Sequence, residues 1–271
     1  MSLLTRSNIE WLNQDGRKGY SINPWVGCAH NCTYCWSRDM RRMSREEWEK
    51  PVIKAEVAPD GLDWMVAAAT TKLKGPSNIL LSATTDFFQP YPAQRLVLGI
   101  QEAVLRGLSY ARGGTQEACD RGFPSEDIQL WVLTKSNTFV AFLPLLERAK
   151  IGVTISSLGP IGPEVFAPSP ILRHLALQEA KKAGCFTYIS IEPWLPGITH
   201  PREIIEMSES YCDWWIVGSL NKMMRAVDPS FYRRELPPLQ EWVRAQGLEK
   251  RVYIKRELRR LCENENYSEI S

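Results

Sequence analysis

Short apolar runs alternate with longer segments of helical periodicity along most of this chain. That alternation is typical of parallel βαβ units, in which each buried strand is followed by a helix. The predicted strands span 78–83, 128–133, 151–155, 185–191, 213–217 and 251–254, after a short extended segment at 21–26. The predicted helices span 38–50, 60–72, 93–108, 139–150, 170–183, 201–209 and 229–246. Five or six such units predict an α/β fold built as a barrel or a partial barrel.

The chain shows no sign of division into several domains. It has 271 residues, no internal repeat and no low-complexity linker, so we expect one domain over residues 1–255. Residues 1–20 are predicted to be an irregular lead-in, and the Gly-rich stretch near 110–125 a loop insertion. Residues 256–271 are charged and polar, which predicts a frayed tail. In folds of this kind the chemistry sits at the carboxyl ends of the strands.

Charge and hydropathy narrow the protein class. The formal net charge is +2 and 44% of the residues are hydrophobic, which suffices for a sizeable core and gives no signature of a dedicated nucleic-acid binder. No apolar run is long enough to cross a bilayer, and residues 1–18 lack the apolar core of a signal peptide. Seven cysteines without an even framework fit a reducing compartment. We therefore expect a cytoplasmic protein with no membrane partner.

Three cysteines, Cys28, Cys32 and Cys35, follow the first extended segment at spacing C-x3-C-x2-C. Three thiolates on one loop can hold three irons of a [4Fe–4S] cluster and leave the fourth open, whereas an electron-transfer cluster normally takes four cysteines. An open iron can bind a small chelating ligand, so this loop is a candidate reaction centre. Two alternatives stay open: a zinc site completed by His30, and cysteines that serve only as small buried apolar residues. The odd, closely spaced set disfavours disulfides.

Polar residues follow nearly every predicted strand. They are Ser82, Thr84, Thr85, Asp86, Thr134, Lys135, Ser136, Ser156, Ser157, Glu192, Ser219, Asn221, Lys222 and Lys255. One interpretation is that any strand has to end in something polar. The other is that hydroxyls, a lysine and carboxylates at one rim bind a zwitterionic cofactor that carries an amine, a carboxylate and a ribose.

The cysteine loop, with Tyr34 before its last cysteine and Trp36 after it, resembles the loop of radical S-adenosylmethionine enzymes. The segments 23–28 and 134–136 resemble the spore-photoproduct-lyase-like branch of that superfamily. A closer resemblance covers most of the chain and is to the phage-associated domain of unknown function related to that branch. It rests on residues 8–11, 23–24, 85–88, 133–135, 190–195, 213–218, 241–244 and 253–255.

This resemblance implies a partial (β/α)6 barrel of the TIM-like type that binds a [4Fe–4S] cluster and S-adenosylmethionine. Reductive cleavage of the cofactor would give methionine and a 5′-deoxyadenosyl radical that abstracts hydrogen from a substrate. It also implies an electron donor of the flavodoxin or ferredoxin type. A nucleic-acid base or nucleotide is the substrate that the branch suggests, and a flat base suits a tryptophan-lined pocket. A small molecule, a peptide, or a non-catalytic iron–sulfur or zinc module stays an alternative.

Carried onto this chain, the resemblance gives a set of candidate cofactor-binding residues: Tyr34, Trp36, Thr84, Asp86, Lys135, Ser156 and Glu192. Tyr34 would lie near the adenine and Trp36 near the cluster, while Lys135 would contact the carboxylate and Ser156 the methionine part. Asp86 or a hydroxyl such as Thr84 would hold the amine, in place of the glycine-rich stretch usual in the family. Glu192 would bind ribose or substrate, or form a salt bridge inside the barrel. The alternative interpretation of Lys135 is a lysine at a strand end whose ammonium is in solvent and binds no ligand.

Some residues argue against the known reaction of the branch or have a structural interpretation. Ala83 stands where the lyase branch places a hydrogen-donating cysteine, so we do not expect repair of spore photoproduct. Cys119, in the Gly-rich loop, is a candidate hydrogen-atom partner. Cys185 and Cys212 are expected in the core, as are Trp194, Trp214 and Trp215, for which stacking on a substrate is the alternative. His174 and His200 are expected to be structural or exposed. The basic cluster Arg38, Arg41, Arg42 and Arg45 is either a solvated helix face or a phosphate-contact patch.

Overall fold

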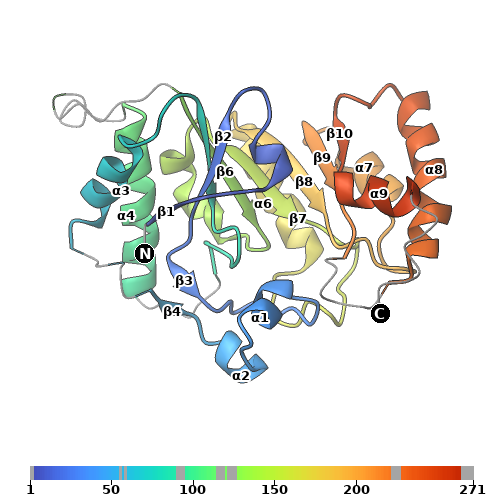
Figure 1. Ribbon diagram of the computed structural model, residues 1–271, viewed down its shortest axis with the longest axis horizontal. Coiled ribbons are helices and arrows are strands. Elements are labelled where there is room, and N and C mark those ends of the chain that lie inside the picture. Colours follow the sequence, from blue (N-terminus) through green and yellow to red (C-terminus); the bar gives the residue numbers. More distant parts are fainter. Residues whose placement is uncertain are drawn as a thin grey trace.

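A sheet of eight strands organises the chain (Figure 1). The computed structural model describes residues 3–54, 57, 60–89, 95–113, 120, 127–220 and 227–263. In order across the sheet, the strands are β1 (Leu4–Arg6), β2 (Lys18–Ile22), β5 (Ser77–Leu81), β6 (Ile128–Thr134), β7 (Lys150–Thr154), β8 (Phe186–Ile191), β9 (Trp214–Val217) and β10 (Val252–Ile254). β1 is antiparallel to β2, and all other neighbours are parallel. The predicted α/β class, with a mostly parallel sheet, is confirmed.

Helices connect the parallel strands, as the alternation in the sequence predicts. They are α3 (Leu62–Thr70), α4 (Arg95–Ala111), the 3-10 helix η2 (Thr138–Leu146), α6 (Pro170–Lys182), α7 (Pro201–Ser208) and α8 (Pro229–Ala245). Figure 1 shows α3 and α4 beside one edge of the sheet and α8 beside the other. None of the helices in the described residues has the length and hydropathy needed to span a bilayer.

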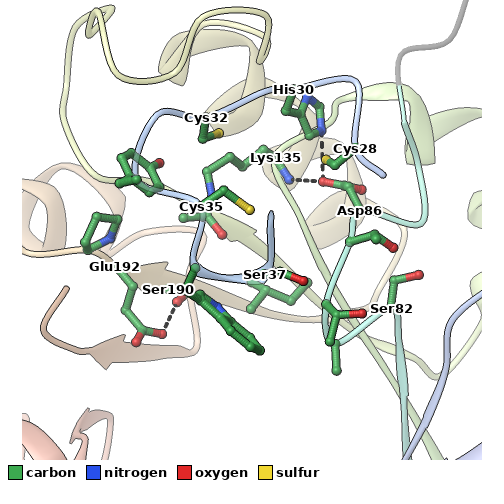
Figure 2. Close-up of a pocket in the computed structure, with 18 of the residues that line it drawn as sticks. Cys28, His30, Cys32, Cys35, Ser37, Ser82, Asp86, Lys135, Ser190 and Glu192 are labelled. Atoms are coloured by element: carbon green, nitrogen blue, oxygen red, sulfur yellow. Dashed lines mark hydrogen bonds and ion pairs between the residues drawn. The ribbon is translucent and has the colours of Figure 1, made fainter. Parts of the chain in front are cut away.

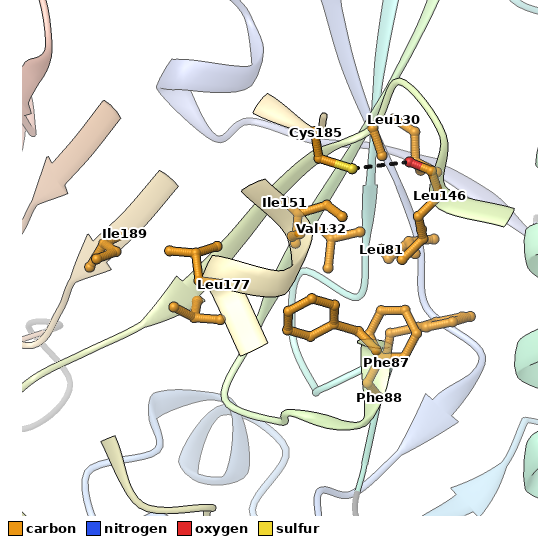
Figure 3. Packing of buried hydrophobic residues seen from close by; sticks show 14 of the residues in the cluster. Leu81, Phe87, Phe88, Leu130, Val132, Leu146, Ile151, Leu177, Cys185 and Ile189 are labelled. Atoms are coloured by element: carbon orange, nitrogen blue, oxygen red, sulfur yellow. Dashed lines mark hydrogen bonds between the residues drawn. The ribbon is translucent and has the colours of Figure 1, made fainter. Parts of the chain in front are cut away.

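The main core lies between the sheet and the helices. Successive residues of a strand point to opposite faces, so Leu81, Val132 and Ile151 point toward the helices, where they pack with Phe88 and Leu177 (Figure 3). All five side chains are fully buried. Burial of apolar area on this face, at about 25 cal/mol per Å², is what holds the helices on the sheet.

The opposite, inner face of the sheet carries an aromatic cluster. A short 3-10 helix, η1 (Glu10–Leu12), brings Trp11 against Trp131, Tyr188 and Trp214, with ring centroids 5.1–6.4 Å apart. The Tyr188 hydroxyl donates to the Val132 carbonyl at 2.6 Å, which satisfies its polar end inside the core. A Cβ at Gly152 would lie 2.3 Å from the Tyr188 ring, so only glycine leaves room for that ring.

Two predicted helices differ in form from what the structure contains. The segment 38–50 is not one helix but two short ones, α1 (Trp36–Met40) and α2 (Arg45–Trp48). Arg42 adopts a left-handed backbone with φ +55°, and Ser44 starts α2 with a capping box to Glu47, so the helix stops and restarts. The helix predicted over 139–150 is instead the 3-10 helix η2, which ends at Leu146 and contains Pro144, a residue without a backbone N–H to donate.

The extended segment predicted at 21–26 is two strands: β2, which begins at Lys18 and ends at Ile22, and β3 (Trp25–Val26), which pairs with β4 (Val52–Ile53) in a separate small sheet. The lead-in predicted to be irregular contains β1 and a short 3-10 helix over Glu10–Leu12.

The predicted frayed tail is wrong over its first half. Residues Arg256–Glu263 form helix α9, whose Leu258 is fully buried in the main core and whose Leu261 packs against it. About one leucine per turn anchors this helix, and most of its other residues are charged. The high charge of the segment is why its sequence carries little sign of a helix. Residues 264–271 and Cys119, which belongs to the predicted loop insertion, lie outside the described residues.

Candidate functional site

A cavity of about 550 Å³ opens at the carboxyl ends of the parallel strands. Its wall brings together the cysteine loop and the residues that follow β5, β6, β8, β9 and β10. The predicted site residues that line it are Cys28, Cys32, Cys35, Tyr34, Trp36, Thr84, Asp86, Lys135 and Glu192. Ser156 is not among the lining residues. Parallel strands end at one edge of the sheet, which is why segments distant in sequence meet here.

The cysteine loop is fixed at both ends by backbone contacts. The Cys28 amide donates to the Trp48 carbonyl at 2.7 Å, and a Cβ at Gly27, which has φ +92°, would lie 2.7 Å from that same oxygen. Further along, the Thr33 amide donates to the Pro163 carbonyl at 2.8 Å. Figure 2 shows the three sulfurs around one side of the cavity. The loop therefore presents its thiols from a rigid frame.

Burial favours the protonated form of two of the three thiols of the cysteine loop, and the three do not converge on one point. Burial raises the pKa of Cys28 well above its ordinary value and that of Cys32 to about 11, although Lys135 lowers the latter in part. In the described residues no three His, Cys, Asp or Glu side chains converge on a single metal position. Separated sulfurs around one cavity suit a cluster, which takes each thiolate at a different iron.

Four buried polar atoms in the cavity wall have no hydrogen-bond partner within the described protein. They are His30 Nδ1, Ser37 Oγ, Trp48 Nε1 and Ser82 Oγ, each on a residue at most 5% exposed. A buried polar group without a partner costs about 1–3 kcal/mol. These four residues line the cavity, but the unpartnered atoms themselves are covered by the protein and do not face its open volume.

Asp86 joins the cysteine loop to the end of β6. Its Oδ1 accepts from the Thr134 hydroxyl at 2.7 Å and the Phe88 amide at 2.9 Å. Its Oδ2 accepts from the Lys135 amide at 2.7 Å and lies 2.9 Å from His30 Nε2 (Figure 2). Burial alone would raise the pKa of Asp86, but His30 and these donors hold it below its ordinary value. With two partners on each oxygen, the carboxylate has little capacity left for the cofactor amine.

Thr84 is held by an asparagine from the other side of the loop. The Asn23 amide nitrogen donates to Thr84 Oγ1 at 2.5 Å, and its oxygen accepts from Thr85 Oγ1 at 2.5 Å. Asn23 therefore ties the chain after β2 to the chain after β5. Both threonines line the cavity, which leaves their hydroxyls at its wall.

Tyr34 and Ser156 converge on a carboxylate behind the cavity wall. The Tyr34 hydroxyl donates to Glu164, and Ser156 Oγ donates to Glu164 Oε1 at 2.8 Å. Arg173 Nη2 lies 2.5 Å from Glu164 Oε2, and both side chains are at most 3% exposed. Ser156 is completely buried in this network, so its hydroxyl is already used. Burial raises the pKa of Tyr34 well above its ordinary value, and the phenol stays protonated.

Lys135 reaches into the cavity beside Tyr34. Its Nζ lies 5.6 Å from the centroid of the Tyr34 ring. Burial alone would raise the pKa of Glu164, but Lys135, Arg173 and the hydrogen bonds of the carboxylate together hold it below its ordinary value. The ammonium acts on the cysteine loop as well, because it lowers the pKa of Cys32 against the effect of burial. It is available to an anionic group of a ligand.

Glu192 and Lys255 form an ion pair on another part of the wall. Lys255 Nζ lies 2.5 Å from Glu192 Oε1, and Ser190 Oγ donates to Glu192 Oε2 at 2.7 Å. Burial alone would lower the pKa of Lys255, but Glu192 and Glu257 raise it above its ordinary value. A Cβ at Gly218 would lie 2.1 Å from Glu192 Oε1, so the strand end leaves space for this carboxylate. Glu192 thus forms the salt bridge that one of its two interpretations expects, and its role toward a ligand stays a prediction.

The cysteines and tryptophans expected in the core lie there, whereas His200 is exposed. Trp194, Trp215, Cys185 and Cys212 are at most 4% exposed and belong to the main core, while Trp214 packs on the inner aromatic cluster. His174 is buried against Tyr211 at 2.6 Å, and His200 precedes α7. Arg41, Arg42 and Arg45 are exposed, and they do not share one helix.

Sequence reasoning missed three contributors to the site: Glu164 with Arg173, Asp86 as the partner of His30, and Glu257 on α9. A signal existed for the first pair. Glu164 is the only charged residue between Lys150 and Arg173, and a lone carboxylate in an apolar stretch usually has a buried partner. Glu257 was missed because the tail was not expected to fold.

Comparison with known proteins places this fold among solved structures. No protein-family model matches the chain. An uncharacterized protein of Methanocaldococcus jannaschii is 22% identical over 209 residues, which cover 74% of this chain and 70% of that protein. Spore photoproduct lyase complexed with dinucleoside spore photoproduct has a TM-score of 0.58 at 11% identity, over 87% of this chain and 75% of that one.

Two further structures share the fold. Spore photoproduct lyase with bound AdoMet and dinucleoside spore photoproduct has a TM-score of 0.57 at 11% identity, over 87% of this chain and 75% of that one. Native anSMEcpe with bound AdoMet has a TM-score of 0.55 at 13% identity, over 87% of this chain and 63% of that one. The chain therefore has the fold of these radical S-adenosylmethionine enzymes.

Proposed function

We propose that this protein is a radical S-adenosylmethionine enzyme whose cluster is held by Cys28, Cys32 and Cys35. The observation that carries this proposal is the position of three thiols of one rigid loop on a cavity that is also lined by Lys135. The shared fold supports it, because two of the solved structures with this fold were determined with bound AdoMet. The cluster with its cofactor would supply reductive C–S bond cleavage and a 5′-deoxyadenosyl radical.

The residues around the cysteine loop have separate roles in this proposal. Lys135 gives the cofactor carboxylate a point cation. Thr84 and Thr85, which line the cavity, are hydrogen-bonding groups for the amine and ribose. Asp86 and Ser156, whose polar atoms are already engaged, keep the loop and its surroundings in place and do not contact the cofactor.

Tyr34 and Trp36 shield the loop. Tyr34 is held by Glu164 on the side away from the cavity opening, so its ring forms part of the wall beside Lys135. Trp36 lines the same cavity. Aromatic walls exclude water, and burial and hydrogen bonding to the sulfurs set the reduction potential of a cluster. An electron carrier of the flavodoxin or ferredoxin type would deliver the electron.

The substrate in this proposal is a nucleic-acid base or nucleotide. Trp36 lines the cavity and is only half-buried, so its ring is an aromatic group on which a base can stack. Two of the similar structures hold a dinucleoside photoproduct. Ala83 lines the cavity where the lyase branch has a cysteine, so the outcome of the reaction differs from that of the lyase.

Anaerobic reconstitution with iron and sulfide tests the proposal. We expect a brown protein that releases 5′-deoxyadenosine from S-adenosylmethionine when dithionite is added, and Cys32→Ala should lose both the cluster and the product. Cys185→Ala is the matched control, because this thiol is buried in the core away from the cavity. A wild-type protein that carries a full cluster but forms no 5′-deoxyadenosine would contradict the proposed enzymatic activity. A colourless protein that binds one zinc would favour the non-catalytic module.

A further inference from the structure

The wall formed by β8, β9, β10 and α9 carries charged side chains that have no role in the cofactor binding proposed above. Figure 2 shows Glu192 and Ser190 across the cavity from Cys28 and Asp86. Lys255 pairs with Glu192 at 2.5 Å, and Glu257 lies 3.9 Å from the same ammonium. The Glu192 and Lys255 side chains are 18% and 22% exposed, and both line the cavity. The pair is therefore accessible to a ligand.

Sheet packing does not by itself require this pair. Taking two charges out of water costs several kcal/mol per ion, and apolar residues of similar volume often replace buried ion pairs without loss of stability. Here the strand end is shaped around the carboxylate, since any side chain at Gly218 would collide with Glu192. Ser190 fixes the second carboxylate oxygen at 2.7 Å. The geometry holds one acceptor and one donor side by side at the cavity wall.

We propose that Glu192 and Lys255 recognise the base-pairing edge of an unpaired nucleobase. This deepens the proposed function and rests on it. A base presents on that edge a hydrogen-bond donor next to an acceptor, as N3–H beside O4 does in uracil. A carboxylate oxygen has two lone pairs and an ammonium has three donors, so both groups keep capacity beyond their mutual contact. Glu192 accepts from the ring N–H and Lys255 donates to the carbonyl.

The local charge selects a neutral edge. Glu192 and Glu257 contribute −1 each and Lys255 contributes +1, which sums to −1 at this wall. A phosphate or carboxylate is repelled there, so the phosphates of a nucleotide stay at the cavity opening. The base can use its pairing edge here only when it is single-stranded or flipped out of a duplex. The site consequently rejects a base that stays in a duplex.

Matched nucleosides test this proposal without any turnover. Equilibrium dialysis is carried out on reconstituted protein with S-adenosylmethionine and no reductant, using uridine, 3-methyluridine and 5-methyluridine. Methylation at N3 removes the donor, whereas methylation at C5 adds the same bulk on the other side of the ring. We expect uridine and 5-methyluridine to bind alike and 3-methyluridine to bind at least about tenfold more weakly, the factor that corresponds to the loss of one such hydrogen bond.

Variants extend the test to the two side chains. Lys255→Met should weaken uridine binding about tenfold, and it should leave the preference for uridine over 3-methyluridine in place, because both nucleosides carry the carbonyl that Lys255 contacts. Lys181→Met is the matched control, since Lys181 makes a 2.5 Å contact to Asp213 outside the cavity. Equal binding of uridine and 3-methyluridine, unchanged binding by Lys255→Met, or no nucleoside binding at all overturns the proposal. Adding dithionite to the same samples and measuring 5′-deoxyadenosine reports separately on the proposed function.

Discussion

His30 and Asp86 lie 2.9 Å apart, and this contact joins the cysteine loop to the sheet. Both side chains are at most 7% exposed, and the same carboxylate also accepts from the end of β6. His30 stands between two of the cysteines, so the loop can be placed only where Asp86 holds the imidazole. The spacing of the three thiols around the cavity thus depends on a residue that follows β5.

Replacing Asp86 by asparagine should loosen that placement. The asparagine side chain keeps the shape but loses the charge and two acceptor positions, and breaking a buried charged contact costs about 3–5 kcal/mol. We expect the free energy of unfolding of the apoprotein, measured in urea, to fall by this amount and iron incorporation to drop. Asp213→Asn is the control, because Asp213 is partly exposed and pairs with Lys181 at the surface. An Asp86 variant as stable as the Asp213 variant would contradict the role given to this contact.

Glu164 and Arg173 form a second buried pair, behind Tyr34. In Arg173→Met the Glu164 carboxylate stays buried without its cation, and we expect a loss of about 3–5 kcal/mol in the free energy of unfolding. The combined change Glu164→Gln with Arg173→Met removes both charges and should recover a large part of that loss. Chemical denaturation of the two single variants and the double variant gives the coupling between them. A double variant that is as unstable as the sum of the single variants would refute a direct coupling.

Local patterns in the sequence predicted the strands and the cysteine loop, because both depend on residues close together in the chain. The run Ile128–Leu133 and the spacing of Cys28, Cys32 and Cys35 are signals of this kind. Contacts between distant segments left no such signal. Asp86 was expected to bind the cofactor, and only the fold shows that distant donors already surround it. Ser156 is buried for the same reason, since Glu164 reaches it from a loop without periodicity.

Substitution of Gly218 tests whether the absence of a side chain at this position leaves the space that the Glu192 carboxylate occupies. A Cβ in Gly218→Ala would lie 2.1 Å from Glu192 Oε1, so the carboxylate has to move away from Lys255. We expect a destabilisation of about 1–3 kcal/mol, the usual cost of overpacking a tight site. The second change Glu192→Ala removes the collision and should make Gly218→Ala nearly neutral. Gly162→Ala is the control, because a Cβ there meets nothing within 4 Å. Equal thermal midpoints for Gly218→Ala and Gly162→Ala would contradict the crowding.

His174 gives the protein a defined acid sensitivity. Burial, and to a smaller extent the neighbouring Arg173, lowers the pKa of His174 to about 4 from its ordinary 6.5. The unfolded chain therefore binds a proton between pH 6.5 and 4 that the folded protein does not bind, and stability falls as the pH decreases through this window. For a shift of this size the loss is about 2 kcal/mol at pH 5.

Because carboxylates also titrate in this range, the measurement is a difference between wild type and His174→Gln. Urea unfolding at pH 7 and pH 5 should show a drop for the wild type that is larger than the drop for the variant by about 2 kcal/mol. Equal drops for the two proteins would show that the imidazole is protonated in the folded state at pH 5.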